Sequence, residues 1–233
     1  MHRSLLALFF ICSLVPAVET PVPVAVAPVW QFEKQVADYE AKDKANPPAI
    51  GTIVFIGSST FTRWSSVVTD MAPLPVYNHA FGGSRTADVL QAVPRLIVPN
   101  KPKVIVYYCG DNDMAKESAD PAVPVQGFKD FVAKVRADLP TVRIIYVSIK
   151  PSPSRIAVWP KAQIANAQVQ TYCASDPTLT YVEIGKQLLD SDGKPKETLY
   201  VKDRLHLNEE GYKLITVVLK PEVEKVWKSA QTE

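Results

Sequence analysis

A serine at the end of a predicted strand is the first residue whose position suggests chemistry. Residues 50–56 are β-branched and nearly uncharged, which predicts a strand buried on both faces. Gly57 ends this run, and Ser58 and Ser59 follow where a helix could begin. Unpaired N–H groups at that junction favour negative charge, so a hydroxyl there suits nucleophilic attack that creates an oxyanion. The alternative is an ordinary serine that caps a helix.

A nucleophilic serine needs a histidine as base and a carboxylate that orients the histidine. The sequence has three histidines, of which His2 lies in the amino-terminal segment and His79 lies inside a predicted strand, where it is interpreted as structural. His206 remains as the candidate base. Asp203 precedes it by three residues, close enough on one turn to meet Nδ1.

Three groups are candidates for stabilising the oxyanion. Gly83 offers an unobstructed backbone N–H, Ser59 offers its own N–H, and Asn112 offers a side-chain amide. Asp111 and Asp113 flank Asn112 and could suggest a cation site, but carboxylates in such a loop more often bond to backbone. No metal site is therefore predicted.

Alternating strands and helices are expected to position these residues. Helices are predicted around Val36, over 86–97, over 125–139, through Val169 and over 209–219, with Pro221 restarting the last one. Strands are predicted at 50–56, 74–81, 103–109, 142–149 and 179–184. Continuous apolar strands between helices predict an α/β fold with a parallel sheet covered on both faces. Ligands in such folds sit outside the carboxyl ends of the strands, where the candidate residues lie.

Four segments together resemble the blocks of the SGNH (GDSL-type) hydrolase family of esterases and acylhydrolases. They are Gly57-Ser58-Ser59, Gly82-Gly83-Ser84, Gly110-Asp111-Asn112-Asp113 and Asp203-Arg204-Leu205-His206. The resemblance spans about residues 50–215. It implies a flavodoxin-like, three-layer α/β/α fold with a five-stranded parallel sheet. Ser58 departs from the pattern, because the first block of the family usually has aspartate there.

The resemblance also implies the role of each site residue. Ser59 would be the nucleophile of an acyl-enzyme mechanism, His206 the base and Asp203 its orienting acid. Gly83, Asn112 and the Ser59 N–H would form the oxyanion hole, and no cofactor would be needed.

Other templates for catalysis are absent from the sequence. It contains no G-x-S-x-G elbow, no phosphate-binding loop, no G-x-G-x-x-G fingerprint and no H-E-x-x-H motif. Three rival functions remain on the same fold. These are an acyltransferase that uses the same site, a lysophospholipase or thioesterase, and a non-catalytic module that binds carbohydrate or lipid.

The segments around the predicted site favour a short acyl group, acetyl above all, on a carbohydrate or other polar alcohol. None of the strand-end loops is long and apolar enough to act as the lid of a lipase. Trp64 and Trp159 could stack on a sugar or cover the acyl group, although such residues more often pack internally. Arg155 could meet an anionic or polyol substrate or could be a solvated surface residue.

Composition sets further limits. The chain has 233 residues, 47% of them hydrophobic and 21% charged, with a formal net charge of +2, which is typical of a globular domain. It has no basic block longer than two residues, so nucleic acid is not an expected partner. A small-molecule or saccharide ester is the expected partner, and the sequence does not indicate the oligomeric state.

The amino terminus resembles a secretory signal peptide. Arg3 precedes the short apolar run 5–14, and Val15-Pro16-Ala17 offers small residues for cleavage. We therefore expect a signal peptide over 1–17, a linker over 18–28 and a hydrolase domain over 29–233, exported to the periplasm or beyond. Cleavage after Ala27 and an uncleaved anchor are alternatives, although stable membrane anchoring is not expected.

Cys109 and Cys173 would then be the cysteines of the mature chain. Because both lie in predicted strands or helices, we expect two buried free thiols, with a disulfide as the alternative.

Overall fold

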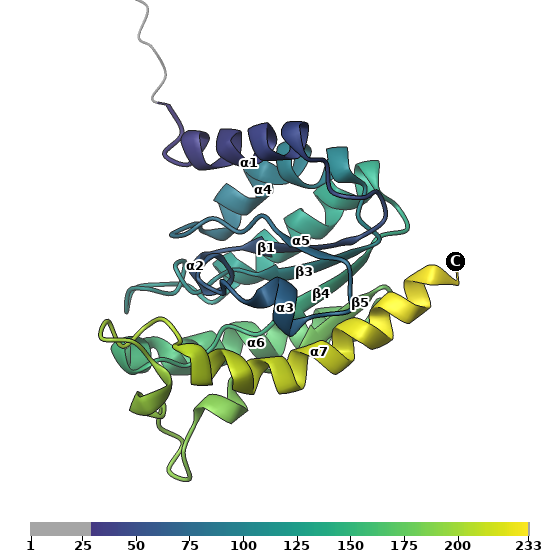
Figure 1. Ribbon diagram of the computed structural model, residues 1–233. Coiled ribbons are helices and arrows are strands. Elements are labelled where there is room, and N and C mark those ends of the chain that lie inside the picture. Colours follow the sequence, from purple (N-terminus) through teal and green to yellow (C-terminus); the bar gives the residue numbers. More distant parts are fainter. Residues whose placement is uncertain (1–28, 233) are drawn as a thin grey trace, which may run out of the picture. The chain divides into compact units, whose positions relative to one another are not determined.

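Five parallel strands form the centre of the computed structural model, which describes residues 29–232 (Figure 1). They are β1 (Ile53–Gly57), β2 (Val76–Asn78), β3 (Val104–Tyr108), β4 (Arg143–Val147) and β5 (Leu179–Val182). Their spatial order is β2-β1-β3-β4-β5, and each neighbouring pair is parallel. The predicted five-stranded, parallel α/β fold is confirmed.

Helices cover both faces of this sheet. One layer contains α4 (Thr86–Leu96), α5 (Ala122–Asp138) and α6 (Trp159–Ala174), with α1 (Glu33–Ala45) packed against α4. The other layer contains the long α7 (Glu209–Gln231) with the short α2 (Ser59–Thr62) and α3 (Val67–Asp70). Figure 1 shows α7, in yellow, on the face opposite to α1 and α4.

Alternation along each strand divides the apolar side chains between the two layers. Phe55 and Val106 belong to the buried cluster that includes Leu219 of α7. Their neighbour Tyr107 instead packs on Phe128 and Phe131 of α5. The middle strands are buried on both faces, which explains why their sequences read as continuous apolar runs.

The bounds of most elements differ from the sequence-based prediction by one to three residues, and two elements differ in a way that the contacts explain. Strand β2 is shorter than 74–81 because Asn78 turns its side chain back on the Ala80 N–H, although Phe81 still donates to the Gly57 carbonyl. The final helix is continuous through Pro221 rather than restarting there. Leu219 and Val223 are buried on either side of Pro221, so packing on the sheet holds the helix together.

Several sequence-based expectations concern the ends of the chain and its thiols. The predicted signal peptide (1–17) and linker (18–28) lie outside the described residues. None of the helices within 29–232 combines the length and the apolar character that crossing a bilayer needs. Cys109 and Cys173 are both free and buried, as expected.

Gly57 allows the chain to turn out of β1 while its backbone stays in contact with the neighbouring strand β3. Its φ is +138°, in the region that favours glycine, and a Cβ placed on it would lie 1.9 Å from the backbone oxygen of Tyr108. The next residue, Ser58, donates its N–H to the same oxygen at 3.0 Å. Glycine is therefore required for the strand-to-helix turn that presents Ser59.

We predict that Gly57→Ala lowers the free energy of unfolding by at least about 3 kcal/mol, because backbone strain and a backbone clash add. Gly193→Ala is the matched control. Gly193 also has a positive φ, +74°, but a Cβ there meets nothing within 4 Å. It should cost only roughly 1–2 kcal/mol. Denaturant unfolding of the two variants measures the difference. Equal losses of unfolding free energy would contradict the close packing of Gly57 against the Tyr108 backbone.

Candidate active site

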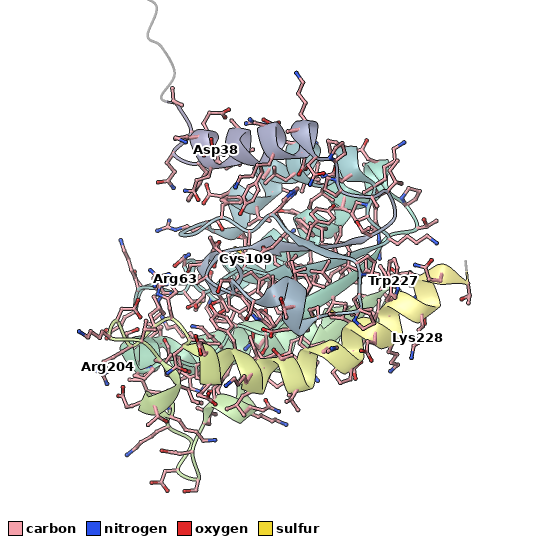
Figure 2. The ribbon with its side chains drawn as sticks, viewed as in Figure 1. Asp38, Arg63, Cys109, Arg204, Trp227 and Lys228 are labelled. Atoms are coloured by element: carbon pink, nitrogen blue, oxygen red, sulfur yellow. The ribbon has the colours of Figure 1, made fainter. Side chains whose placement is uncertain are left out.

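The candidate residues meet at the carboxyl ends of the strands. Ser59 begins α2, directly after β1, and Asn112 lies in the loop that follows β3. His206 lies in the loop before α7. In Figure 2, Arg63 and Arg204 lie toward this end of the sheet, whereas Trp227 and Lys228 lie toward the other end. The topology thus brings together side chains that are far apart in the sequence.

Ser59, His206 and Asp203 form a continuous chain of hydrogen bonds. Nε2 of His206 lies 2.8 Å from Oγ of Ser59, and Nδ1 lies 2.7 Å from Oδ2 of Asp203. A carboxylate can only accept, so Nδ1 carries the proton and Nε2 is left to accept from the serine hydroxyl. The imidazole therefore has the tautomer that a general base for Ser59 requires.

The loop itself fixes Asp203. Its Oδ1 accepts the N–H groups of Leu205 and His206, both at 2.9 Å, while Oδ2 faces the imidazole. Desolvation alone would raise the pKa of Asp203, but the hydrogen bonds from His206 and Leu205 outweigh it and hold that pKa well below its usual range. Arg204, with φ at +57°, makes the turn between the acid and the base.

The structure distinguishes the two adjacent serines. Ser58 is 1% exposed, and its backbone oxygen accepts the N–H groups of Phe61 and Thr62. Ser59 is partly exposed and lines an open hollow of about 240 Å³ together with His206. A substrate in that hollow would therefore meet the hydroxyl of Ser59.

Gly83 and Asn112 line the same hollow. The φ of Gly83 is +87°, so its backbone conformation, rather than a lack of space, explains the glycine. Asn112 donates one Nδ2 hydrogen to the carbonyl of Ser84 at 2.9 Å. A primary amide has a second Nδ2 hydrogen, which suits it to an oxyanion beside Ser59.

Trp64 does not lie where a substrate could stack on it. Its side chain is 1% exposed, its ring stacks on Tyr212 with centroids 5.3 Å apart, and Nε1 donates to Asp70 at 2.6 Å. Both faces of the indole are therefore used by the protein core. This geometry agrees with the alternative that Trp64 packs internally, and it leaves no exposed ring face for a substrate.

Trp159 also lies outside the Ser59 hollow. It is partly exposed at the start of α6 and lines a separate hollow with Gln163, Tyr181 and Glu183. Trp159 therefore does not line the hollow beside Ser59, and a contact between Trp159 and a larger substrate stays a prediction.

Arg155 contacts the protein instead of facing a substrate. Its guanidinium bonds to the carboxylate and the carbonyl of Asp111, and Nη2 donates to Oδ1 of Asn112 at 3.0 Å. Its side chain is 18% exposed. The donors of the fork are directed at Asp111 and Asn112, and a direct contact between Arg155 and substrate stays a prediction.

Sequence reasoning missed Lys150, whose side chain is fully buried beside Asp111. The one signal in the sequence was a lysine at the end of an apolar strand, just before a proline. His79, in contrast, lies away from this site, with its ring nitrogens at Leu96 and Asp43. Asp113 accepts the backbone N–H and the hydroxyl of Thr86 at the start of α4.

Solved structures with the same fold can be superposed on most of this chain. A GDSL-like lipase from Bacteroides thetaiotaomicron has a TM-score of 0.70 and 19% identity, over 82% of this chain and 97% of that one. A carbohydrate esterase family 3 protein from Talaromyces cellulolyticus has a TM-score of 0.63 and 12% identity, over 77% and 99%. A mutant of an acetyl-xylooligosaccharide esterase from Geobacillus Stearmophilus has a TM-score of 0.61 and 12% identity, over 76% and 95%.

These identities are low enough that the structures show the fold alone. None of the curated proteins matches the chain in sequence. The model of the GDSL-like lipase/acylhydrolase family, in contrast, matches residues 51–214, which include every residue of the Ser59–His206–Asp203 relay. The chain therefore belongs to the GDSL-like lipase/acylhydrolase family of ester hydrolases.

Proposed function

We propose that this protein is an exported serine esterase that removes short acyl groups, acetyl above all, from a saccharide or another polar alcohol. The observation that carries the proposal is the bonded relay from Asp203 through His206 to Ser59. The proposed export rests on the sequence of residues 1–17.

The relay supports a two-step mechanism. Ser59 attacks the ester carbonyl while His206 takes its proton at Nε2, and Asp203 stabilises the imidazolium that results. The N–H groups of Ser59 and Gly83 and the amide of Asn112 stabilise the tetrahedral oxyanion. His206 then gives the proton to the departing alcohol. A water molecule, activated by the same histidine, releases the acid from the acyl-enzyme.

The size of the Ser59 hollow supports a short acyl group. Its volume is about 240 Å³, and Leu205 is the one large apolar residue among those that line it. Each additional methylene contributes about 0.8 kcal/mol only where apolar surface can receive it. A long acyl chain would leave this hollow and lie in solvent.

A second hollow supports a polar alcohol. It measures about 460 Å³, adjoins the first at Arg63 and carries both signs of charge, as in Asp70, Glu209 and Lys213. Such a surface suits hydroxyl groups better than hydrocarbon. The acetyl-xylooligosaccharide esterase among the similar folds is consistent with this choice of substrate.

We predict that Ser59→Ala lowers kcat by about 10⁴ or more, because the nucleophile is lost. Ser58→Ala is the matched control and should cost far less, since Ser58 is buried. Turnover of p-nitrophenyl acetate by the two purified variants measures both effects. An inactive Ser58→Ala beside an active Ser59→Ala would reverse the assignment.

We predict that Asn112→Ala lowers kcat by roughly 10²–10³ while KM changes little, because the amide binds the oxyanion more strongly than the ground-state carbonyl. Steady-state kinetics on the same ester separate the two constants. A near-normal kcat would mean that Asn112 only closes its loop through Ser84.

We predict that kcat/KM for p-nitrophenyl esters peaks at roughly two to four acyl carbons and falls steeply beyond about eight, because Leu205 is the one large apolar residue that lines the Ser59 hollow and longer chains would extend beyond it. Release of acetate from acetylated polysaccharides, with and without a polyol acceptor, then separates hydrolysis from acyl transfer. An optimum at ten carbons or more, or activation at a lipid surface, would favour a lysophospholipase or thioesterase.

A further inference from the structure

A buried lysine beside the active site has no part in the reaction described above. Lys150 follows β4, and its side chain has no exposed surface. Its Nζ donates to the carbonyl of Leu205 at 2.8 Å and lies 3.3 Å from Oδ2 of Asp111. Burying a charge costs several kcal/mol unless it is well paired, so the placement of this lysine needs an explanation.

Asp111 joins Lys150 to a second cation. Its Oδ2 faces Lys150 and accepts from the hydroxyl of Tyr108 at 3.1 Å, while Oδ1 pairs with Arg155. Desolvation would raise the pKa of Asp111, but the charges of Lys150 and Arg155 lower it, so the carboxylate stays ionised. We call Lys150, Asp111 and Arg155 the ionic cluster.

One end of the ionic cluster holds the oxyanion donor. Arg155 donates from Nη2 to Oδ1 of Asn112, and Nδ2 of the same amide donates to Ser84. A flipped amide would turn its NH₂ group against a guanidinium, so the orientation is fixed. A cation on the carbonyl oxygen also polarises the amide, which makes its N–H groups stronger donors.

The other end holds the base. Leu205, whose carbonyl accepts from Lys150, directly precedes His206 in the chain. The same two segments are joined again where Ser154 donates its N–H to Arg204 at 3.0 Å and Tyr200 donates its hydroxyl to Pro151 at 2.7 Å. The segment 150–155 therefore contacts both the Asn112 loop and the His206 loop.

We propose that Lys150 and Arg155, which Asp111 joins, are positioning residues. Arg155 orients the amide of Asn112, and Lys150 holds the loop that carries the imidazole of His206, so that both groups face Ser59. The inference rests on the proposed esterase function and deepens it. A buried ion pair adds little net stability in many proteins, and in some it fixes a single defined geometry. The ionic cluster accordingly links two loops whose relative placement catalysis requires.

Arg155→Lys tests the link to Asn112. A lysine can keep the charge pair with Asp111, but it lacks the planar fork that reaches Asn112 at the same time. We expect kcat for p-nitrophenyl acetate to fall about 10- to 100-fold, less than full loss of an oxyanion donor, with KM and the unfolding midpoint nearly unchanged.

Arg136→Lys is the matched control. Arg136 lies on α5, away from the active site. Its guanidinium pairs with Asp176 at 2.7 Å and also donates to the hydroxyl of Thr178. Its kcat should stay within about two-fold of wild type, because a conservative change at a remote ion pair leaves the transition state untouched.

The Asn112→Ala background separates positioning from a general structural effect. In the Asn112→Ala protein, adding Arg155→Lys should lower kcat by no more than about two- to three-fold, because the amide that Arg155 positions is already absent. Lys150→Met should lower kcat in the otherwise native protein. If that variant does not fold, the pair of Arg155→Lys measurements still decides the link to Asn112. Lys150→Gln, which keeps a donor near the Leu205 carbonyl, then decides the link to the His206 loop: a kcat equal to that of wild type would overturn it.

An Arg155→Lys variant with the kcat of wild type would overturn the inference. So would an equal loss of kcat with and without Asn112. These outcomes differ from failure of the proposed function, in which the wild-type protein itself would hydrolyse no ester.

Discussion

The hydrogen bond between Ser59 and His206 is the contact on which the site depends. It joins residues that are 147 positions apart, one at the end of the central strand β1 and one just before the last helix. The sheet fixes the serine, because Gly57 packs directly against the backbone of β3. The histidine lies in a loop instead, where its carbonyl accepts the Val201 N–H at 2.9 Å and Leu207 forms an isolated antiparallel bridge with Tyr200. Its loop depends on Asp203 within the turn and on contacts with the segment that follows β4.

The surroundings of that bond determine what it can act on. The Ser59 hollow is small and open, and its neighbour at Arg63 is polar. A large apolar surface would be needed to hold a lipid chain, and these two hollows do not offer one. The same relay could therefore serve many esters in this fold, and the proposed preference for a short acyl group on a hydroxyl-rich partner rests on the residues that line the two hollows.

Local sequence predicted the parts of the structure that depend on local pattern. Apolar runs located all five strands, and strand ends pointed to Ser59 and Asn112. The choice among three histidines, together with Asp203 three residues earlier, pointed to His206. The environment of Trp64 could not be predicted, because stacking on Tyr212 depends on how α7 packs. Contacts made by Arg155 and Lys150 were missed for the same reason. Charged residues look solvated in a sequence, and only the fold brings Asp111 between them.

Covalent labelling of the native protein tests whether Ser59 is the activated nucleophile. A fluorophosphonate reacts with a serine only where a base activates the hydroxyl and an oxyanion hole accepts the new oxygen. We expect one adduct for each chain, located on Ser59 by peptide mass spectrometry and lost in His206→Ala. A stable adduct on Ser58 instead, or labelling of Ser59 that persists without His206, would contradict this assignment.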